Sequence, residues 1–116
     1  MTGSAYALTL TLPAAGFRVT AGEAVVGGLH APDLHHFHCS HCLSWVFTQP
    51  ETERFVNLRA SMLDDATWFR PFADMYVSEQ LAFAETAAPR RFERFPDLSV
   101  YPELAAAYAI DGARPH

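Results

Sequence analysis

Residues 37–47, Phe-His-Cys-Ser-His-Cys-Leu-Ser-Trp-Val-Phe, place two cysteines between two stretches of strand-forming residues. Residues 34–38 have an extended pattern, and residues 44–48 are rich in the aromatic and β-branched side chains that are enriched in strands. We therefore predict a strand-turn-strand unit with Cys39 and Cys42 at its tip.

The flanking segments predict further short strands. Residues 6–12 and 17–20 alternate apolar and polar side chains around a Pro/Gly turn, which is typical of an antiparallel hairpin. We also expect strands at residues 24–26, 55–60 and 74–78. Strands at this spacing, about 8–12 residues, favour an antiparallel β fold.

One helix is expected near the C-terminus. Pro102 stands at a first-turn position, residues 103–110 follow as the helix, and Gly112 closes it. Asp64 and Asp65 are in a capping position ahead of a single helical turn at 66–69. The predicted fold class is mainly β and antiparallel, with a short C-terminal helix.

Composition sets the size and the partners of this fold. The 116 residues are 50% apolar and 13% aromatic, which excludes a disordered chain and predicts a single domain over residues 1–116. A net charge of −5, with no basic run longer than Arg90-Arg91, argues against nucleic acid or an anionic membrane as partner. The opening residues carry no positive charge before Arg18, unlike a secretory signal, so we expect a reducing cytoplasm.

The cysteine turn has two chemical interpretations. With two residues between them, Cys39 and Cys42 can bind one tetrahedral cation or form a reversible disulfide. Strand-type residues follow Cys42 directly, whereas a thioredoxin-like pair opens a helix, so the context favours a metal. A structural zinc needs four ligands, and the cysteines supply two.

Histidines are the obvious candidates for the missing ligands. Five of the six lie within residues 30–41, but His38 is expected to point away from the face of Cys39, and polar residues on a solvated strand are the better interpretation. The six are His30, His35, His36, His38, His41 and His116.

For most of the other side chains that could react or bind a ligand, a structural role is favoured over a functional one. The Asp64-Asp65 pair could act as a general acid and base, but capping is favoured. The aromatic residues could line a pocket but are expected in the core: Phe55, Phe69, Phe72, Trp45, Trp68 and Tyr76. Arginine forks could bind a carboxylate-rich ligand such as glutathione at Arg59, Arg90 or Arg91.

Four stretches resemble the later part of the glutathione-dependent formaldehyde-activating family. Residues 3–7 are similar to the segment that follows the family's cysteine cluster, and residues 37–47 to its second zinc-knuckle strand pair. Residues 62–65 resemble its Leu-Asp-Asp motif, and residues 97–102 its Pro-containing C-terminal segment. The four stretches span nearly the whole chain in the order expected for the family.

This resemblance implies a β-tent fold of small stacked sheets with a zinc-knuckle turn. It also implies a structural zinc held by Cys39, Cys42 and a Cys-x-Cys pair nearer the N-terminus, and a second zinc, on another cysteine cluster, that serves the chemistry. Both N-terminal clusters are missing from the sequence, so we expect a chain shortened at its N-terminus, through a misassigned start or a natural or engineered deletion.

The activity implied by the resemblance is that of a carbon–sulfur lyase, similar to S-(hydroxymethyl)glutathione synthase. Its ligand would be glutathione or another small thiol adduct of an aldehyde, and the shortened chain is expected to be inactive. The alternatives are a non-catalytic zinc or interaction module, able to form a homodimer over apolar surface, and a redox dithiol that cycles through a disulfide.

Overall fold

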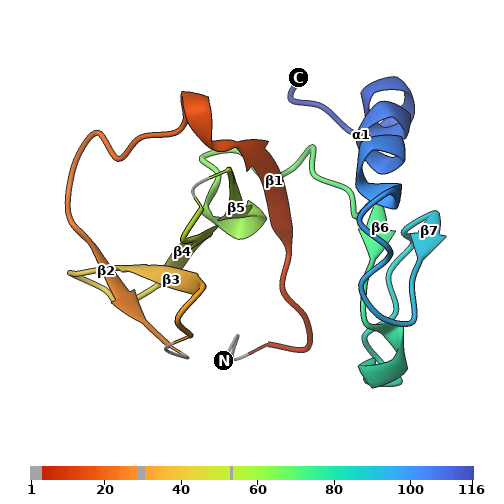
Figure 1. Ribbon diagram of the computed structural model, residues 1–116, viewed down its shortest axis with the longest axis horizontal. Helices are drawn as coiled ribbons and strands as arrows, with labels where there is room; N and C mark the ends of the chain where they lie inside the picture. Colours follow the sequence, from red (N-terminus) through yellow and green to blue (C-terminus); the bar gives the residue numbers. More distant parts are fainter. Residues whose placement is uncertain (1–3, 29–30, 53) are drawn as a thin grey trace. The chain divides into compact units, whose positions relative to one another are not determined.

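The computed structural model describes residues 4–28, 31–52 and 54–116, and Figure 1 shows the path of the chain. The chain forms two compact units, Met1–Asp64 and Asp65–His116. Two such units can belong to one domain or to two, so the single domain stays a prediction. The described residues are mainly β, with one five-stranded antiparallel sheet and one α-helix.

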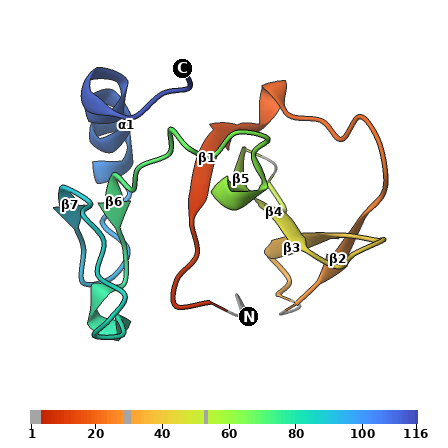
Figure 2. The same cartoon turned by 180° about the vertical axis from the view of Figure 1, so that it is seen from behind.

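The first unit is built on the five-stranded sheet, whose strand order is β1-β5-β4-β3-β2 and whose neighbours all pair antiparallel (Figure 2). The strands are β1 (Thr9–Pro13), β2 (Ala24–Gly27), β3 (Leu34–Cys39), β4 (Trp45–Pro50) and β5 (Phe55–Arg59). The predicted strands at 24–26, 34–38, 44–48 and 55–60 are therefore confirmed, with ends shifted by one or two residues.

The predicted hairpin between residues 6–12 and 17–20 is wrong. β1 pairs with β5 instead, in a register that runs from Thr9 opposite Arg59 to Pro13 opposite Phe55. A 3₁₀ turn at Ala14–Gly16 redirects the chain after β1, and residues 17–20 form no strand. Phe17 packs its ring edge-on against Phe47 at 4.8 Å, so its side chain covers the sheet rather than extending it.

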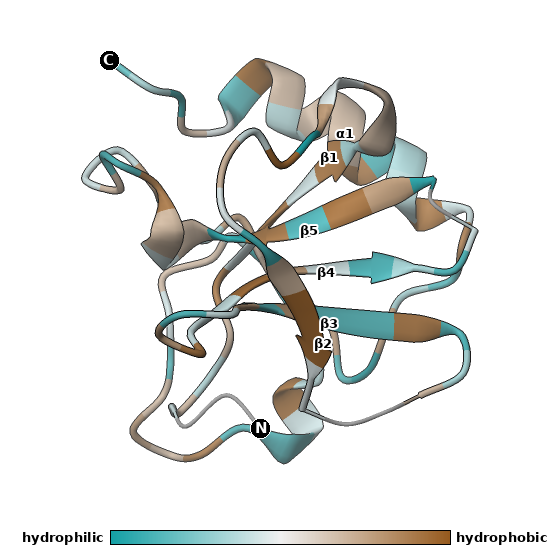
Figure 3. Cartoon of the chain, turned by 90° about the vertical axis from the view of Figure 1, so that its left-hand side faces the viewer, coloured by the Kyte–Doolittle hydropathy of each residue, from teal (hydrophilic) through white to brown (hydrophobic). Residues whose placement is uncertain are grey.

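One face of the sheet is apolar. The rings of Phe37 and Phe47 stack at 4.7 Å, and Val56 is fully buried. Hydrophobic and hydrophilic residues alternate along β5 in Figure 3, as expected for a strand with a different environment on each face. Burial of this apolar face is the main favourable contribution to the stability of the first unit.

A β-bulge changes the register between β3 and β4. Phe37 pairs with Phe47, but the next pair along β3 is His38 with Trp45, so Val46 is the extra residue on β4. In a regular strand Trp45 and Phe47 would share a face. The bulge instead puts Trp45 on the face opposite Phe47, with His36 and His38.

The second unit contains a short parallel pair, β6 (Ala73–Asp74) with β7 (Arg90–Arg91). The strand predicted at 74–78 is wrong beyond Asp74. Tyr76 has a left-handed backbone, with φ of 59°, and a 3₁₀ turn follows at Val77–Glu79. This conformation breaks the extended path that the side-chain pattern suggested.

The predicted C-terminal helix is confirmed as α1 (Val100–Asp111). It begins before Pro102, because the Asp97 carboxylate accepts hydrogen bonds from the backbone N–H and the hydroxyl of Ser99, both at 3.0 Å. Gly112 ends it as expected, although with an extended backbone and not a left-handed one. No helix in residues 4–28, 31–52 and 54–116 is long and apolar enough to cross a membrane.

The burial of Val56 gives a direct test of the core. Val56→Ala should lower the free energy of unfolding by about 2 kcal/mol, because it removes two methyl groups from a position with 0% exposure and leaves a cavity. Val19→Ala is the matched control, since Val19 is 51% exposed and its truncation should change stability by less than about 0.5 kcal/mol. Urea unfolding of the three proteins measures both effects, and equal losses would contradict this core.

Candidate functional site

Backbone hydrogen bonds fix the cysteine turn. The N–H of Cys39 donates to the carbonyl of Ser44 at 2.9 Å, and the N–H of Leu43 donates to the carbonyl of Cys39 at 2.8 Å. Leu43 has a left-handed backbone with φ of 60°, which reverses the chain directly after Cys42. The N–H of Ser40 donates to the carbonyl of Glu23 at 3.1 Å and holds the turn against the start of β2.

The two cysteines carry free thiols. Cys42 is exposed, Cys39 is half-buried, and the side chain of Cys39 is within hydrogen-bond reach of the Cys42 sulfur. The Cys42 thiol donates to the hydroxyl oxygen of Ser44 at 3.3 Å, and hydrogen bonding with the side chain and backbone of Ser44, followed by the Cys39 side chain, lowers the pKa of this thiol. The turn thus presents two cysteine thiols, one of them with a lowered pKa, and cysteine sulfur is a suitable ligand for zinc.

Within the described residues the cysteine turn offers two metal ligands, Cys39 and Cys42. In residues 4–28, 31–52 and 54–116 no group of three or more His, Cys, Asp or Glu side chains is placed to hold a metal ion. His30 lies outside the described residues. His41 is exposed within the turn, and His38 contacts Trp45 on the other face of the sheet. The cysteine turn therefore fits one half of a tetrahedral zinc site.

A polar cluster lies on the face of the sheet opposite Phe37 and Phe47. Nδ1 of His36 is 2.8 Å from Oγ1 of Thr48, and Nε1 of Trp45 donates to the same oxygen at 2.9 Å. Because the indole N–H can only donate, the arrangement that satisfies all three groups has Thr48 donating to His36 and the imidazole proton on Nε2. Burial, followed by the charges of His38 and His35, lowers the pKa of His36.

Arg59 belongs to this cluster. Its guanidinium lies over the indole ring of Trp45, 4.5 Å from the centroid, while the ring of His38 lies nearly parallel to the same indole at 6.4 Å. Burial lowers the pKa of Arg59. Trp45, predicted as a core residue, thus joins the histidines and Arg59 at a polar site.

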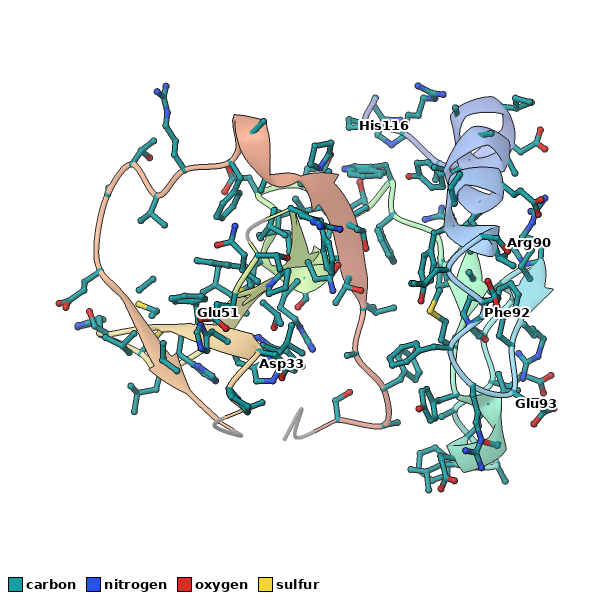
Figure 4. The ribbon with its side chains drawn as sticks, viewed as in Figure 1. Asp33, Glu51, Arg90, Phe92, Glu93 and His116 are labelled. Carbon is teal, nitrogen blue, oxygen red and sulfur yellow. The ribbon has the colours of Figure 1, made fainter. Side chains whose placement is uncertain are left out.

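The other predicted arginines are already engaged in the second unit. Arg91 pairs with Asp74 at 3.0 Å and donates to Gln80 at 2.5 Å. Arg90, labelled beside β7 in Figure 4, lies over the ring of Phe72 at 4.7 Å. Both contacts hold the second unit together, which favours a structural role for these two side chains.

The remaining candidates have structural roles as well. Asp65 accepts hydrogen bonds from the backbone N–H and the hydroxyl of Thr67, at 2.9 and 2.5 Å, and so caps the turn as predicted. Phe72 packs edge-on against Tyr108 at 5.2 Å. At the end of the β3–β4 pair away from the cysteines, the N–H of Glu51 donates to the carbonyl of Asp33 at 3.1 Å, and both residues are labelled in Figure 4.

Comparison of the chain with family models, curated proteins and solved structures gave no match.

Sequence reasoning missed the cluster of Trp45, Thr48 and Arg59 with the two histidines. The alternation of His36 and His38 along one strand was the available signal, since it places both on the same face. The bulge that brings Trp45 to that face leaves no recognisable mark in the sequence.

The Ser44 contact predicts the reactivity of Cys42. Ser44→Ala should raise the pKa of the Cys42 thiol and slow its alkylation by iodoacetamide near neutral pH, because the thiolate loses a hydrogen-bond donor. Ser40→Ala is the control within the same turn and should leave the rate unchanged. Alkylation rates of Cys42, measured by mass spectrometry as a function of pH, test this prediction. An unaltered pH profile in Ser44→Ala would exclude this role of Ser44.

The buried His36 predicts a loss of stability in acid. Its pKa is lowered from 6.5 in the folded state, so below about pH 6.5 the unfolded chain binds more protons and the free energy of unfolding falls. His36→Gln should make this fall shallower. His41→Gln, at an exposed position, is the matched control and should keep the wild-type slope. Urea unfolding between pH 5 and 8 measures the slopes.

Proposed function

We propose that the cysteine turn is one half of a zinc site, in a zinc-binding β-tent protein of the glutathione-dependent formaldehyde-activating type. The two thiols of Cys39 and Cys42 carry this proposal, because they are free, adjacent and held on one reversed turn between β3 and β4. Thiolates at this spacing match the ligand pairs of structural zinc sites. The resemblance of residues 37–47 to the family's zinc knuckle supports the same assignment.

Two further ligands complete the tetrahedron. They come from residues outside the described part of the chain or from the cysteine turn of a second copy, since the described residues offer no third ligand at the turn. The backbone bonds of Cys39, Leu43 and Ser44 hold the pair in place without the ion. Ser44 favours the thiolate of Cys42, the form in which cysteine binds zinc.

The chemistry proposed for the family is the joining of a thiol and a small aldehyde. The thiol sulfur bonds to the carbonyl carbon while its proton passes to the carbonyl oxygen, and the reverse reaction breaks the same carbon–sulfur bond. A zinc with an open position supplies a Lewis acid for this step when bound. Cys39 and Cys42 supply a structural pair only, so we expect no turnover of glutathione and formaldehyde by this chain alone.

Cobalt, a spectroscopic substitute for zinc, tests the metal site. The reduced chain should bind Co²⁺ with a thiolate-to-metal charge-transfer absorption, and Zn²⁺ should displace it. Cys39→Ser and Cys42→Ser should each weaken binding at least about tenfold, because each removes a ligand. Ser40→Ala is the control and should bind as the wild type does. Equal binding by the cysteine variants would exclude this site.

Zinc stoichiometry separates the two sources of the missing ligands. One zinc per two chains, with a zinc-dependent dimer in sedimentation, identifies the second copy as the source. One zinc per monomer identifies ligands from elsewhere in the same chain. A ¹³C NMR assay of glutathione with formaldehyde in the presence of the zinc-loaded chain then tests the activity, and acceleration above the uncatalysed rate would contradict a purely structural zinc.

A further inference from the structure

Arg59 has hydrogen-bond donors without acceptors. Its Nε and Nη1 atoms are buried and have no partner within the described residues, and no carboxylate there pairs with it. A buried donor without an acceptor is destabilising, and more so when it is charged. In native proteins such groups nearly always have a hydrogen-bond partner. The unpartnered donors of Arg59 therefore point to an acceptor that is not part of this unit.

The position of the guanidinium is fixed before any ligand binds. Arg59 lies over the indole of Trp45 at 4.5 Å, and the indole is held in turn by its hydrogen bonds to Thr48 at 2.9 Å and to the carbonyl of Phe47 at 3.3 Å. Nη2 is not among the buried unpartnered atoms and makes no hydrogen bond to the described residues, so it is the end of the guanidinium that is open to solvent there. An anion can therefore approach Nη2 from solvent, with the buried Nη1 next to it on the same guanidinium.

A second unpartnered group lies on the same indole. Nδ1 of His38 is buried without a partner, and the His38 ring lies nearly parallel to Trp45 at 6.4 Å. Gly27 leaves room for this ring, because a Cβ built on Gly27 would be 2.9 Å from Nδ1. His38 on β3 and Arg59 on β5 thus flank Trp45 on one face of the sheet. Together the two side chains have three buried polar atoms without a hydrogen-bond partner.

We propose that this face binds a small carboxylate, with Arg59 as the anchoring cation and Trp45 as the platform that holds it. A carboxylate only accepts hydrogen bonds and matches the fork of an arginine. Arg59 is the one residue of the group that always carries a positive charge, which suits a single negative charge better than a phosphate dianion. The unpartnered Nδ1 of His38 can form a hydrogen bond with a second polar atom of the ligand.

The carboxylate site is independent of the proposed zinc. Cys39 follows His38 along β3, and neighbouring residues of a strand point to opposite faces of the sheet. A chain that has lost its cysteines should therefore still bind the carboxylate, and a chain that has lost Arg59 should still bind cobalt. Failure of one proposal is thereby distinguished from failure of the other.

NMR titration with sodium acetate tests the site. Wild-type chain should show saturable shifts of the Trp45 Nε1–H and Arg59 Nε–H signals, with a dissociation constant in the millimolar range expected for one charge-assisted contact. Sodium chloride at matched ionic strength is the reference. Arg59→Met should weaken binding by about tenfold or more. Arg54→Met is the matched control, because Arg54 is an exposed arginine just before β5, and it should bind as the wild type does.

Arg59→Lys keeps the inference testable if Arg59→Met does not fold. It retains the charge but loses the fork, so binding should weaken without disappearing. The proposal is overturned if acetate gives no saturable shift up to about 100 mM, a limit far above millimolar affinity. It is also overturned if folded Arg59→Met binds as well as the wild type, or if inorganic phosphate binds more tightly than acetate.

Discussion

The β-bulge between β3 and β4 is the constraint on which the chemistry of the sheet depends. With Phe37 opposite Phe47, regular pairing would put Trp45 among the apolar rings of that face. The extra residue, Val46, moves the indole to the opposite face, where it contacts His36, His38 and Arg59. A bulge also increases the local twist of a strand. The same irregularity lies directly before the cysteine turn, so it affects both how β3 ends and how β4 begins.

The two faces of the sheet consequently have different roles, one in stability and the other in presenting polar side chains. The apolar face, with Phe37, Phe47 and Val56, supplies the burial that stabilises the first unit. The polar face buries His36 and part of Arg59, which cost stability unless their hydrogen bonds are made. His36 has its partner in Thr48, whereas Arg59 has none among the described residues. Arg59 is a half-buried cation with no carboxylate partner among the described residues, which is consistent with the binding role that we propose for it.

The sequence predicts the parts of the fold that depend on local side-chain patterns. Side-chain alternation located β3, β4 and β5, and the Cys-x-x-Cys spacing located the turn between two of them. It did not predict the pairing of β1 with β5, whose partners Thr9 and Arg59 are far apart in the chain, because no local pattern encodes a partner strand. It also missed the left-handed residues Leu43 and Tyr76, since neither is a glycine. The proposed carboxylate site depends on the pairing of β4 with β5 and on the bulge between β3 and β4, so the sequence identified Arg59 only by its charge.

Leu43 has a costly backbone conformation that the hydrogen bonds of the cysteine turn require. A left-handed backbone costs a bulky L-residue about 1–2 kcal/mol, and Leu43 is 68% exposed, so its side chain recovers little of that cost by burial. The conformation is retained because the bonds from Leu43 to Cys39 and from Cys39 to Ser44 require the chain to reverse there. The same reversal brings Ser44 to the Cys42 sulfur and lowers the pKa of that thiol. The left-handed backbone of Leu43 and the lowered pKa of the Cys42 thiol therefore have one geometric cause, the reversal of the chain at this turn.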